Sequence, residues 1–197
     1  MNGAVVMKKG LLFLLLFLLS TTTVFAESTP TVTQKNYTVA IIPYLNTTEE
    51  TKDFVKDVVQ SKYAEEFTTK NFNVVADVDV QKALHTAGYD VSNMELPEKD
   101  VFAAVAKETK ADYVVAMEIT NLISTRHMSF FSTKVETKAK LKYKFYNTSQ
   151  DKLTAFQTTG DSENVATLVG NVGYKAPITA ALNKAMDSGY DKIVSNF

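Results

Sequence analysis

The sequence of 197 residues contains no cysteine. Disulfide bonds are therefore excluded, although an exported protein could have used them. A bacterial lipoprotein carries its lipid on a cysteine at the cleavage site, so lipid attachment of that kind is excluded as well. The chain must be held together by an ordinary hydrophobic core.

Arginine and histidine are also scarce. Arg126 is the sole arginine, which argues against a function built on bidentate arginine clamps for phosphate or carboxylate groups. The two histidines, His85 and His127, have no second histidine or cysteine at motif spacing. We therefore expect no metal site and no cofactor. The chain has no Gly-x-Ser-x-Gly, no Ser-x-x-Lys with its partner motifs, no His-Glu-x-x-His and no phosphate loop, and we predict no catalytic residue.

Proline and glycine are few, at 4 and 7 residues, while 45% of the chain is hydrophobic. This composition is typical of an ordered globular protein rather than a disordered one. Without Lys8 and Lys9 the 21 basic residues fall to 19 against 22 acidic ones, a net charge of −3. Such a balance gives no electrostatic reason to expect nucleic acid as a partner.

Residues 7–26 have the pattern of a secretory signal peptide. A basic start is followed by an apolar run over residues 11–19, and small residues precede a cleavage site between Ala26 and Glu27. The run is shorter than the roughly 20 residues that a membrane-spanning helix needs. We therefore expect a cleaved signal, no stable membrane span in the mature chain, and a soluble protein in the periplasm or outside the cell.

The domain organisation follows from this signal. The start of the pattern favours Met7 as the true first residue, so that residues 1–26 are signal peptide and upstream sequence. Residues 27–36 contain Thr, Ser and Pro and are expected to form a flexible leader. The remaining residues 37–197 suit one domain, because about 160 residues can bury roughly two-thirds of their unfolded surface.

The first half of this domain alternates strands and helices. Residues 37–44 form an apolar, β-branched run that predicts a strand buried on both faces. Thr47 and Glu50 have the spacing of a capping box, so we expect a helix to start there. The pattern then predicts a short strand over residues 72–75, helices over residues 77–87 and 96–110, and a third strand over residues 111–119.

The second half predicts antiparallel strands. Residues 122–131 and 135–146 read as two long strands joined by a polar turn near Ser132, and residues 152–159 as a further strand. Residues 160–173 are expected to be a loop, and residues 174–194 an amphipathic helix. The predicted fold class is α/β: a mixed sheet with helices packed on it, in the order βαβααβ, then antiparallel strands and a C-terminal helix.

Lysines occupy alternate positions of the strand over residues 135–146. Lys138, Lys140, Lys142 and Lys144 therefore share one face and form a candidate surface for an anionic partner. The competing interpretation is a solvated outer face, on which lysine also protects the sheet against edge-to-edge aggregation. Phe130 and Phe131 are a candidate anchor for a partner, although two neighbours on a strand usually place one ring inside.

Three segments carry a resemblance to a known family. Residues 39–44 with 46–48, residues 73–77 and residues 102–115 resemble an envelope α/β superfamily. It includes the curli-secretion channel lipoprotein (CsgG-type), the N-terminal domain of the Tol-system propeller protein and the lipoprotein activators of peptidoglycan synthases. Lys110 stands where that family usually has glycine, a departure expected to change the turn. The resemblance implies the fold and a non-enzymatic adaptor or channel role.

The sequence thus favours a non-enzymatic, exported envelope protein that acts as a binding or assembly component. Its partner is expected to be an envelope protein or an anionic polymer. One alternative is an enzyme acting on envelope polymer, which a convergent pair of buried carboxylates in a pocket would favour. The other is an oligomeric secretion-pore subunit, which an unpacked hairpin over residues 122–146 with an apolar, lipid-facing side would favour.

Overall fold

The structure, a computed structural model, describes residues 36–50, 52–68, 72–167 and 172–196. The predicted signal peptide, its cleavage site after Ala26 and all of the predicted leader except Asn36 lie outside these ranges. None of the helices in the described ranges combines the length and the apolar character that crossing a bilayer requires.

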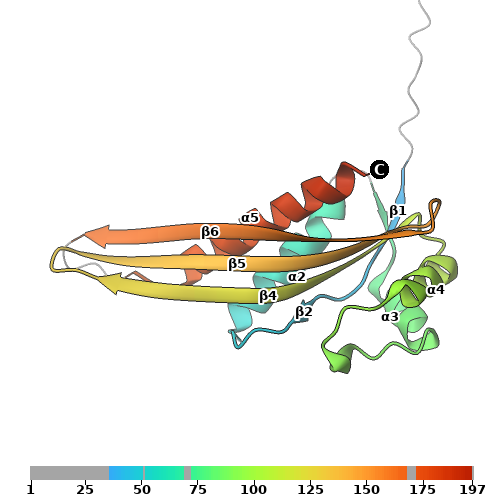
Figure 1. The fold of residues 1–197 in the computed structure, drawn as a ribbon, viewed down its shortest axis with the longest axis horizontal. Helices are drawn as coiled ribbons and strands as arrows, with labels where there is room; N and C mark the ends of the chain where they lie inside the picture. The colour runs from blue at the N-terminus through green and yellow to red at the C-terminus, as the bar shows by residue number, and fades with distance from the viewer. Residues whose placement is uncertain (1–35, 51, 69–71, 168–171, 197) are drawn as a thin grey trace, which may run out of the picture. The chain divides into compact units, whose positions relative to one another are not determined.

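In the described part of the chain, six strands form one mixed sheet with the order β3-β1-β4-β5-β6, and β2 pairs with β4 beside β1 (Figure 1). The strands β1, β2, β3 and β4 are parallel, whereas β4, β5 and β6 are antiparallel. The strands are β1 (Thr38–Ile41), β2 (Leu45–Asn46), β3 (Asn73–Val74), β4 (Tyr113–Met128), β5 (Ser132–Asn147) and β6 (Lys152–Thr167). The predicted α/β class with a mixed sheet is confirmed.

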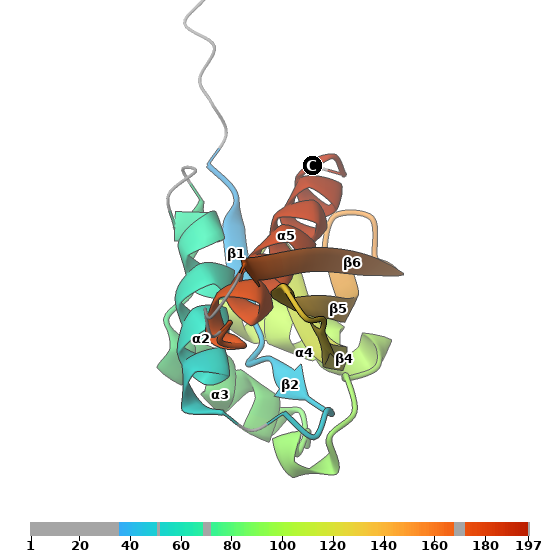
Figure 2. The same ribbon diagram turned by 90° about the vertical axis from the view of Figure 1, so that its left-hand side faces the viewer.

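Among the described residues, four α-helices cover the two faces of this sheet (Figure 2). They are α2 (Asp53–Thr68), α3 (Asp77–Thr86), α4 (Lys99–Thr109) and α5 (Lys175–Val194), and a short 3-10 helix, η2 (Val91–Asn93), precedes α4. Successive residues of β4 point to opposite faces, so Val115 packs under α2 and α5 while Val114 packs under α3 and α4. The sheet therefore separates two hydrophobic cores, and its central strands are buried on both sides.

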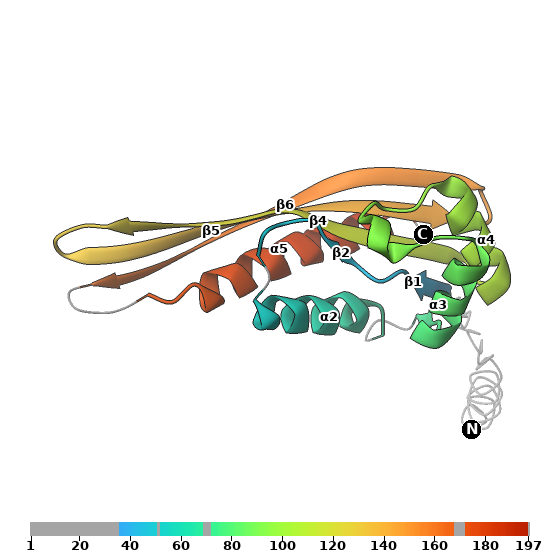
Figure 3. The same ribbon diagram turned by 90° about the horizontal axis from the view of Figure 1, so that it is seen from below.

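The strands β4 and β5 are 16 residues each and pair over nearly their whole length. The predicted strands over residues 111–119 and 122–131 are thus one continuous strand, interrupted only by an irregularity between Ile119 and Asn121. The sequence looked like two strands because this extra residue shifts the alternation of side chains by one position. Seen from below in Figure 3, the far ends of β4 and β5 extend past the N-terminal end of α5.

The strand β6 is longer than the sequence predicted. Residues 160–167 were expected to be loop, but they pair with β5 as far as Ser132↔Thr167. The polar run over residues 160–164 resembles a loop because it lies at the edge of the sheet, where one face and one side are exposed to solvent. Gly160 has a packing role: a Cβ there would lie 2.0 Å from the backbone oxygen of Ala181 in α5.

The predicted capping box at the start of α2 is wrong. The Thr47 hydroxyl lies 3.0 Å from both Glu118 Oε1 and the Ile119 backbone oxygen. This contact ties the end of β2 to β4, and α2 begins only at Asp53. Thr47 thus makes a tertiary contact with β4 in place of the local contact that a capping box requires.

The turn after α4 also differs from expectation. Lys110 has φ 55° and ends the helix in the left-handed conformation that glycine adopts most easily. The lysine therefore does not remove the left-handed turn, and its Cβ carries a steric cost of about 1–2 kcal/mol.

Candidate functional site

The lysines of β5 do lie on one face of the sheet, but they have different surroundings. Lys138 and Lys140 are exposed, and Lys142 is half-buried with its Nζ 4.0 Å from Glu118 Oε2. We call these three residues the lysine surface. Lys138 and Lys140 line a hollow of about 720 Å³ over β4, β5 and β6, which Ile123 and His127 also line.

Lys144 does not belong to this surface. It is only 8% exposed, and its Nζ lies 2.9 Å from Glu98 Oε1, 2.8 Å from the Pro97 oxygen and 3.3 Å from the Leu96 oxygen. The alternation of β5 continues to Lys144, but at this point residues 96–98 before α4 cover the face. The sequence prediction for Lys144 is corrected: its ammonium group fastens this segment to the sheet.

The rest of this face carries acids as well as lysines. Asp161 and Glu163 of β6 lie opposite Lys138 and Glu136 of β5. Lys134 forms ion pairs with both Glu136 and Glu163, the latter at 2.9 Å. The charges on this face are therefore mixed, which weakens the electrostatic argument for an anionic partner. That the lysine surface binds such a partner stays a prediction.

The most exposed apolar residues lie where β4 turns into β5. Phe130 is 99% exposed, Met128 78% and Phe131 73%. We call residues 128–131 the hairpin tip. The two rings lie 6.0 Å apart, centroid to centroid. The expectation that one phenylalanine ring would be inside is wrong, because both occupy the turn rather than a strand.

The turn itself is closed by two serines. The Ser129 backbone N–H donates to the Ser132 oxygen at 2.8 Å, and the Ser132 N–H donates to Ser129 Oγ at 3.1 Å. Phe130 and Phe131 are the two central residues, and neither has a positive φ. Two-residue hairpin turns favour glycine, asparagine or aspartate at these positions because the favoured turn types need positive φ. The phenylalanines are therefore not there to make the turn.

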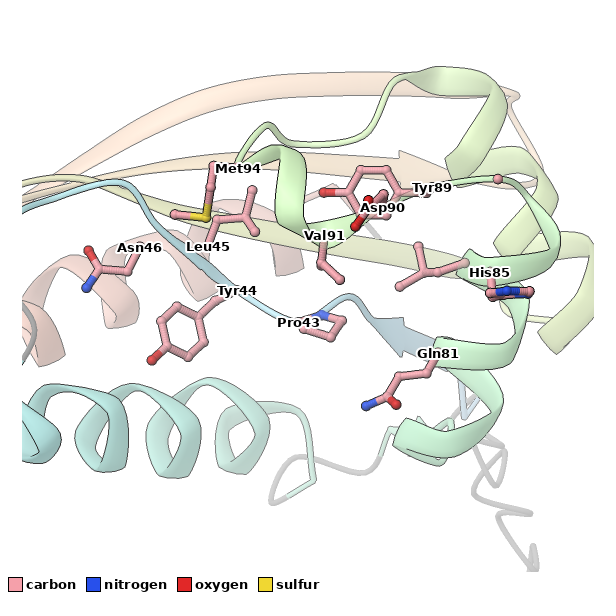
Figure 4. A pocket seen from close by; sticks show the side chains of 12 residues that line it. Pro43, Tyr44, Leu45, Asn46, Gln81, His85, Tyr89, Asp90, Val91 and Met94 are labelled. Carbon is pink, nitrogen blue, oxygen red and sulfur yellow. The ribbon is translucent and has the colours of Figure 1, made fainter.

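A cleft of about 970 Å³ lies between residues 43–46, which join β1 to β2 and form β2, and residues 81–94, which run from α3 past η2. Buried Leu45 and Leu84 form its apolar floor, whereas Val91 and Met94 are 44% and 45% exposed at its rim. Figure 4 shows the lining side chains, including Tyr44 and Tyr89. We call it the tyrosine cleft. No sequence pattern indicated this cleft, because its walls are about 40 residues apart in the chain.

Asp90 is the one acidic residue among the described residues that line the tyrosine cleft. The Ser92 backbone N–H donates to Asp90 Oδ1 at 2.8 Å, and this hydrogen bond lowers the pKa of Asp90. Burial, together with the charges of Asp90 and Glu118, raises the pKa of Tyr89. The Tyr89 hydroxyl donates to the Glu95 oxygen at 2.6 Å. At neutral pH the cleft thus presents a neutral phenol beside an ionised carboxylate.

The scarce residues singled out in the sequence are dispersed. His85 lies on the exposed surface of α3 at the tyrosine cleft, whereas His127 lies on β4 with its Nε2 3.6 Å from Glu136 Oε2. Arg126 donates to the Val172 oxygen at 2.7 Å and stacks over the Tyr174 ring, so it holds the start of α5. Within the described ranges no group of three or more histidine, aspartate or glutamate side chains could hold a metal ion.

One carboxyl group has a strongly perturbed pKa. Burial between α2 and α5, helped by a hydrogen bond with Asp187, raises the pKa of Glu66 to about 7, against the opposing effect of Lys62. The Lys62 ammonium lies 3.2 Å from Glu66 Oε1 and 2.6 Å from Asp187 Oδ1. Glu66 and Asp187 line neither the tyrosine cleft nor the hollow over the lysine surface.

We expect ionisation of this carboxyl group to lower the free energy of unfolding as the pH rises. Between the ordinary pKa of 4.5 and about 7 the folded chain holds a proton that the unfolded chain has lost. The stabilisation is therefore full below pH 4.5 and disappears as the pH rises through 7. The variant Glu66→Gln should match the wild type at pH 5 and exceed its free energy of unfolding by about 2 kcal/mol at pH 8. Urea unfolding across this pH range measures the difference; a difference that does not change with pH would contradict the assignment.

No protein-family model matches the sequence, and no curated protein matches it. Among solved structures, the chain is similar to lipoprotein GNA1162 from Neisseria meningitidis, with 10% identity over 82% of this chain and 99% of that chain and a TM-score of 0.48. It is similar to the C-terminal domain of LpoB from Escherichia coli, with 11% identity over 64% and 82% and a TM-score of 0.42. It is also similar to PelC of the dodecamer from Paraburkholderia phytofirmans, with 14% identity over 77% and 86% and a TM-score of 0.42. At these identities and TM-scores, the likenesses do not assign the chain to a family.

Proposed function

We propose that this protein is an exported, non-enzymatic component of the bacterial envelope that binds another envelope protein through its hairpin tip. The observation that carries the proposal is the exposure of Phe130 and Phe131, at 99% and 73%, in the centre of a tight turn. Large exposed apolar residues in a turn that does not need them call for a role outside folding. The export itself rests on the predicted signal peptide.

The surroundings of the tip favour a protein partner over a lipid surface. Behind the phenylalanines, Lys134 is paired with Glu136 and Glu163, so the tip is an apolar anchor with a charged rim of both signs. Protein interfaces have this arrangement, with an aromatic centre and a polar rim. The two acids would be repelled by the anionic headgroups of a membrane surface.

The two alternatives have less support. The carboxylates of Glu66 and Asp187 converge, but they share Lys62 and lie outside the cleft, where an enzyme acting on a polymer would need them. The hairpin of β4 and β5 extends past α5, yet neither face is wholly apolar: Lys138 lies on one face, and Thr137 and its β4 partner Ser124 lie on the other. The condition set for a pore subunit is therefore not met.

The proposal is tested by crosslinked recovery of a partner from the envelope fraction of the source organism. The double variant Phe130→Ser, Phe131→Ser should lower recovery of the partner by roughly tenfold or more, since each buried aromatic ring contributes about 1.5–3 kcal/mol. Its thermal stability should stay unchanged, because both rings are largely exposed to solvent.

The matched control is Ile123→Ser, which removes a 58% exposed apolar side chain from β4, the strand that leads into the hairpin tip. This variant should retain the partner. Equal recovery by the double variant and the wild type would refute the proposal, and so would binding to lipid vesicles that depends on the two phenylalanines while no protein is recovered.

A further inference from the structure

We propose that the tyrosine cleft is a second binding site, which takes an extended peptide segment carrying a lysine or arginine next to an apolar side chain. This site is separate from the hairpin tip, and the inference does not depend on the function proposed for the tip. Three features of the described residues support it: the shape of the cleft, its charge and the form of its inner wall.

The shape is that of a ligand site. Its volume of about 970 Å³ lies at the upper end of the range for small-molecule pockets and can hold several side chains. The floor is apolar, with Leu45 and Leu84 each 4% exposed. The rim adds Met94, held at φ 53° and 45% exposed, so an apolar side chain stands at the entrance in a costly backbone conformation.

The charge favours a cationic occupant. Residues 77–98, which form α3, η2 and the segment after it, contain five acids against one lysine, and of these acids Asp90 lines the cleft. Among the lining residues Asp90 carries a negative charge, and Glu118 lies close enough to Tyr89 to influence its ionisation. Tyrosine rings attract an ammonium or guanidinium group through their π faces. A cation beside Asp90 and Tyr89 would gain both interactions.

The remaining positive groups near the cleft are accounted for. The Lys142 ammonium lies 4.0 Å from Glu118 Oε2 and pairs with that carboxylate, and the Lys56 side chain lines a separate hollow that shares Pro43, Tyr44 and Gln81 with the cleft. His85 on the cleft wall is exposed. None of these groups separates the Tyr89 ring from the Asp90 carboxylate.

The inner wall of the cleft indicates which parts of a peptide would be recognised. Pro43 lies between β1 and β2 and has no N–H to donate, so a peptide cannot extend the sheet there by continuous strand pairing. The recognition must come mainly from side chains: an apolar one on the floor and a cationic one at Asp90. An extended peptide with alternating apolar and basic residues satisfies both.

The test uses the peptide acetyl-Leu-Lys-Leu-Lys-Leu-amide and NMR of the methionine methyl groups. Met94 reports on the cleft and Met128 on the hairpin tip, so the two sites are read separately in one titration. We expect a saturable shift of the Met94 methyl and none of the Met128 methyl. The peptide with glutamine in place of lysine should bind roughly tenfold more weakly, and spermidine, which lacks apolar side chains, should be as weak.

The variant Asp90→Asn keeps the hydrogen-bond acceptor for Ser92 but removes the charge. It should weaken the lysine peptide by roughly fivefold or more, as expected for loss of a charge-assisted contact. The matched control Asp161→Asn on β6 should bind as the wild type does. Equal binding of the lysine and glutamine peptides, unchanged binding by Asp90→Asn, or a shift at Met128 instead of Met94 would each overturn the proposal.

Discussion

Replacing Gly160 with alanine is expected to lower the free energy of unfolding by about 3 kcal/mol. The added Cβ would lie 2.0 Å from the backbone oxygen of Ala181 and 2.8 Å from the backbone nitrogen of Ala185. Both atoms belong to the backbone of α5, so no side chain can turn away to make room. The helix would have to move off β6, which would disturb the packing of Leu182 and Met186 in the core below α2 and α5.

Urea unfolding followed by circular dichroism measures this loss. Gly173→Ala is the matched control, because a Cβ at Gly173 meets no atom within 4 Å. It should change the free energy of unfolding by less than about 1 kcal/mol. If both variants were equally stable, the close approach of α5 to β6 would be wrong.

The variant Lys144→Met is expected to cost about 3 kcal/mol, although the new side chain has a similar length. The ammonium group holds the Leu96 and Pro97 oxygens and the Glu98 carboxylate. Without it, the two buried oxygens lose their donor, and the segment that leads into α4 is released from the sheet. Protease sensitivity between η2 and α4 should increase along with the loss of stability.

Lys140→Met is the control for this prediction. Lys140 lies on the same face of the same strand but is exposed. Its replacement should change stability by no more than about 0.5 kcal/mol. Equal effects of the two substitutions would mean that Lys144 does not hold residues 96–98 against the sheet.

The alternation of β5 was predictable because a strand with one buried face repeats every two residues. Val135, Leu141 and Tyr143 are an even number of residues apart and are all buried, as that pattern predicts. The same pattern could not place Lys144, because the segment that covers it comes from residues 96–98. Burial by a distant part of the chain leaves no trace in the local alternation.

The edge strand β6 and the two candidate binding features were harder to predict for related reasons. Residues 160–164 are polar because they lie at an edge, and edges and loops have similar compositions. The tyrosine cleft exists only because β2 pairs with β4 and brings Tyr44 close to Tyr89. The Phe130 and Phe131 pair was visible in the sequence, but its exposure depends on the exact position of the turn, which was placed near Ser132 rather than at the pair itself.

The proposed function rests on the hairpin tip, and one measurement tests it most directly. A photo-crosslinking phenylalanine analogue, p-benzoylphenylalanine, is placed at position 130 in the living cell, and the adducts are compared with those formed from position 123 on β4. We predict one dominant adduct with a second envelope protein from position 130, and a much smaller amount from position 123. No protein adduct from position 130, or the same adducts in equal amounts from both positions, would contradict the proposal.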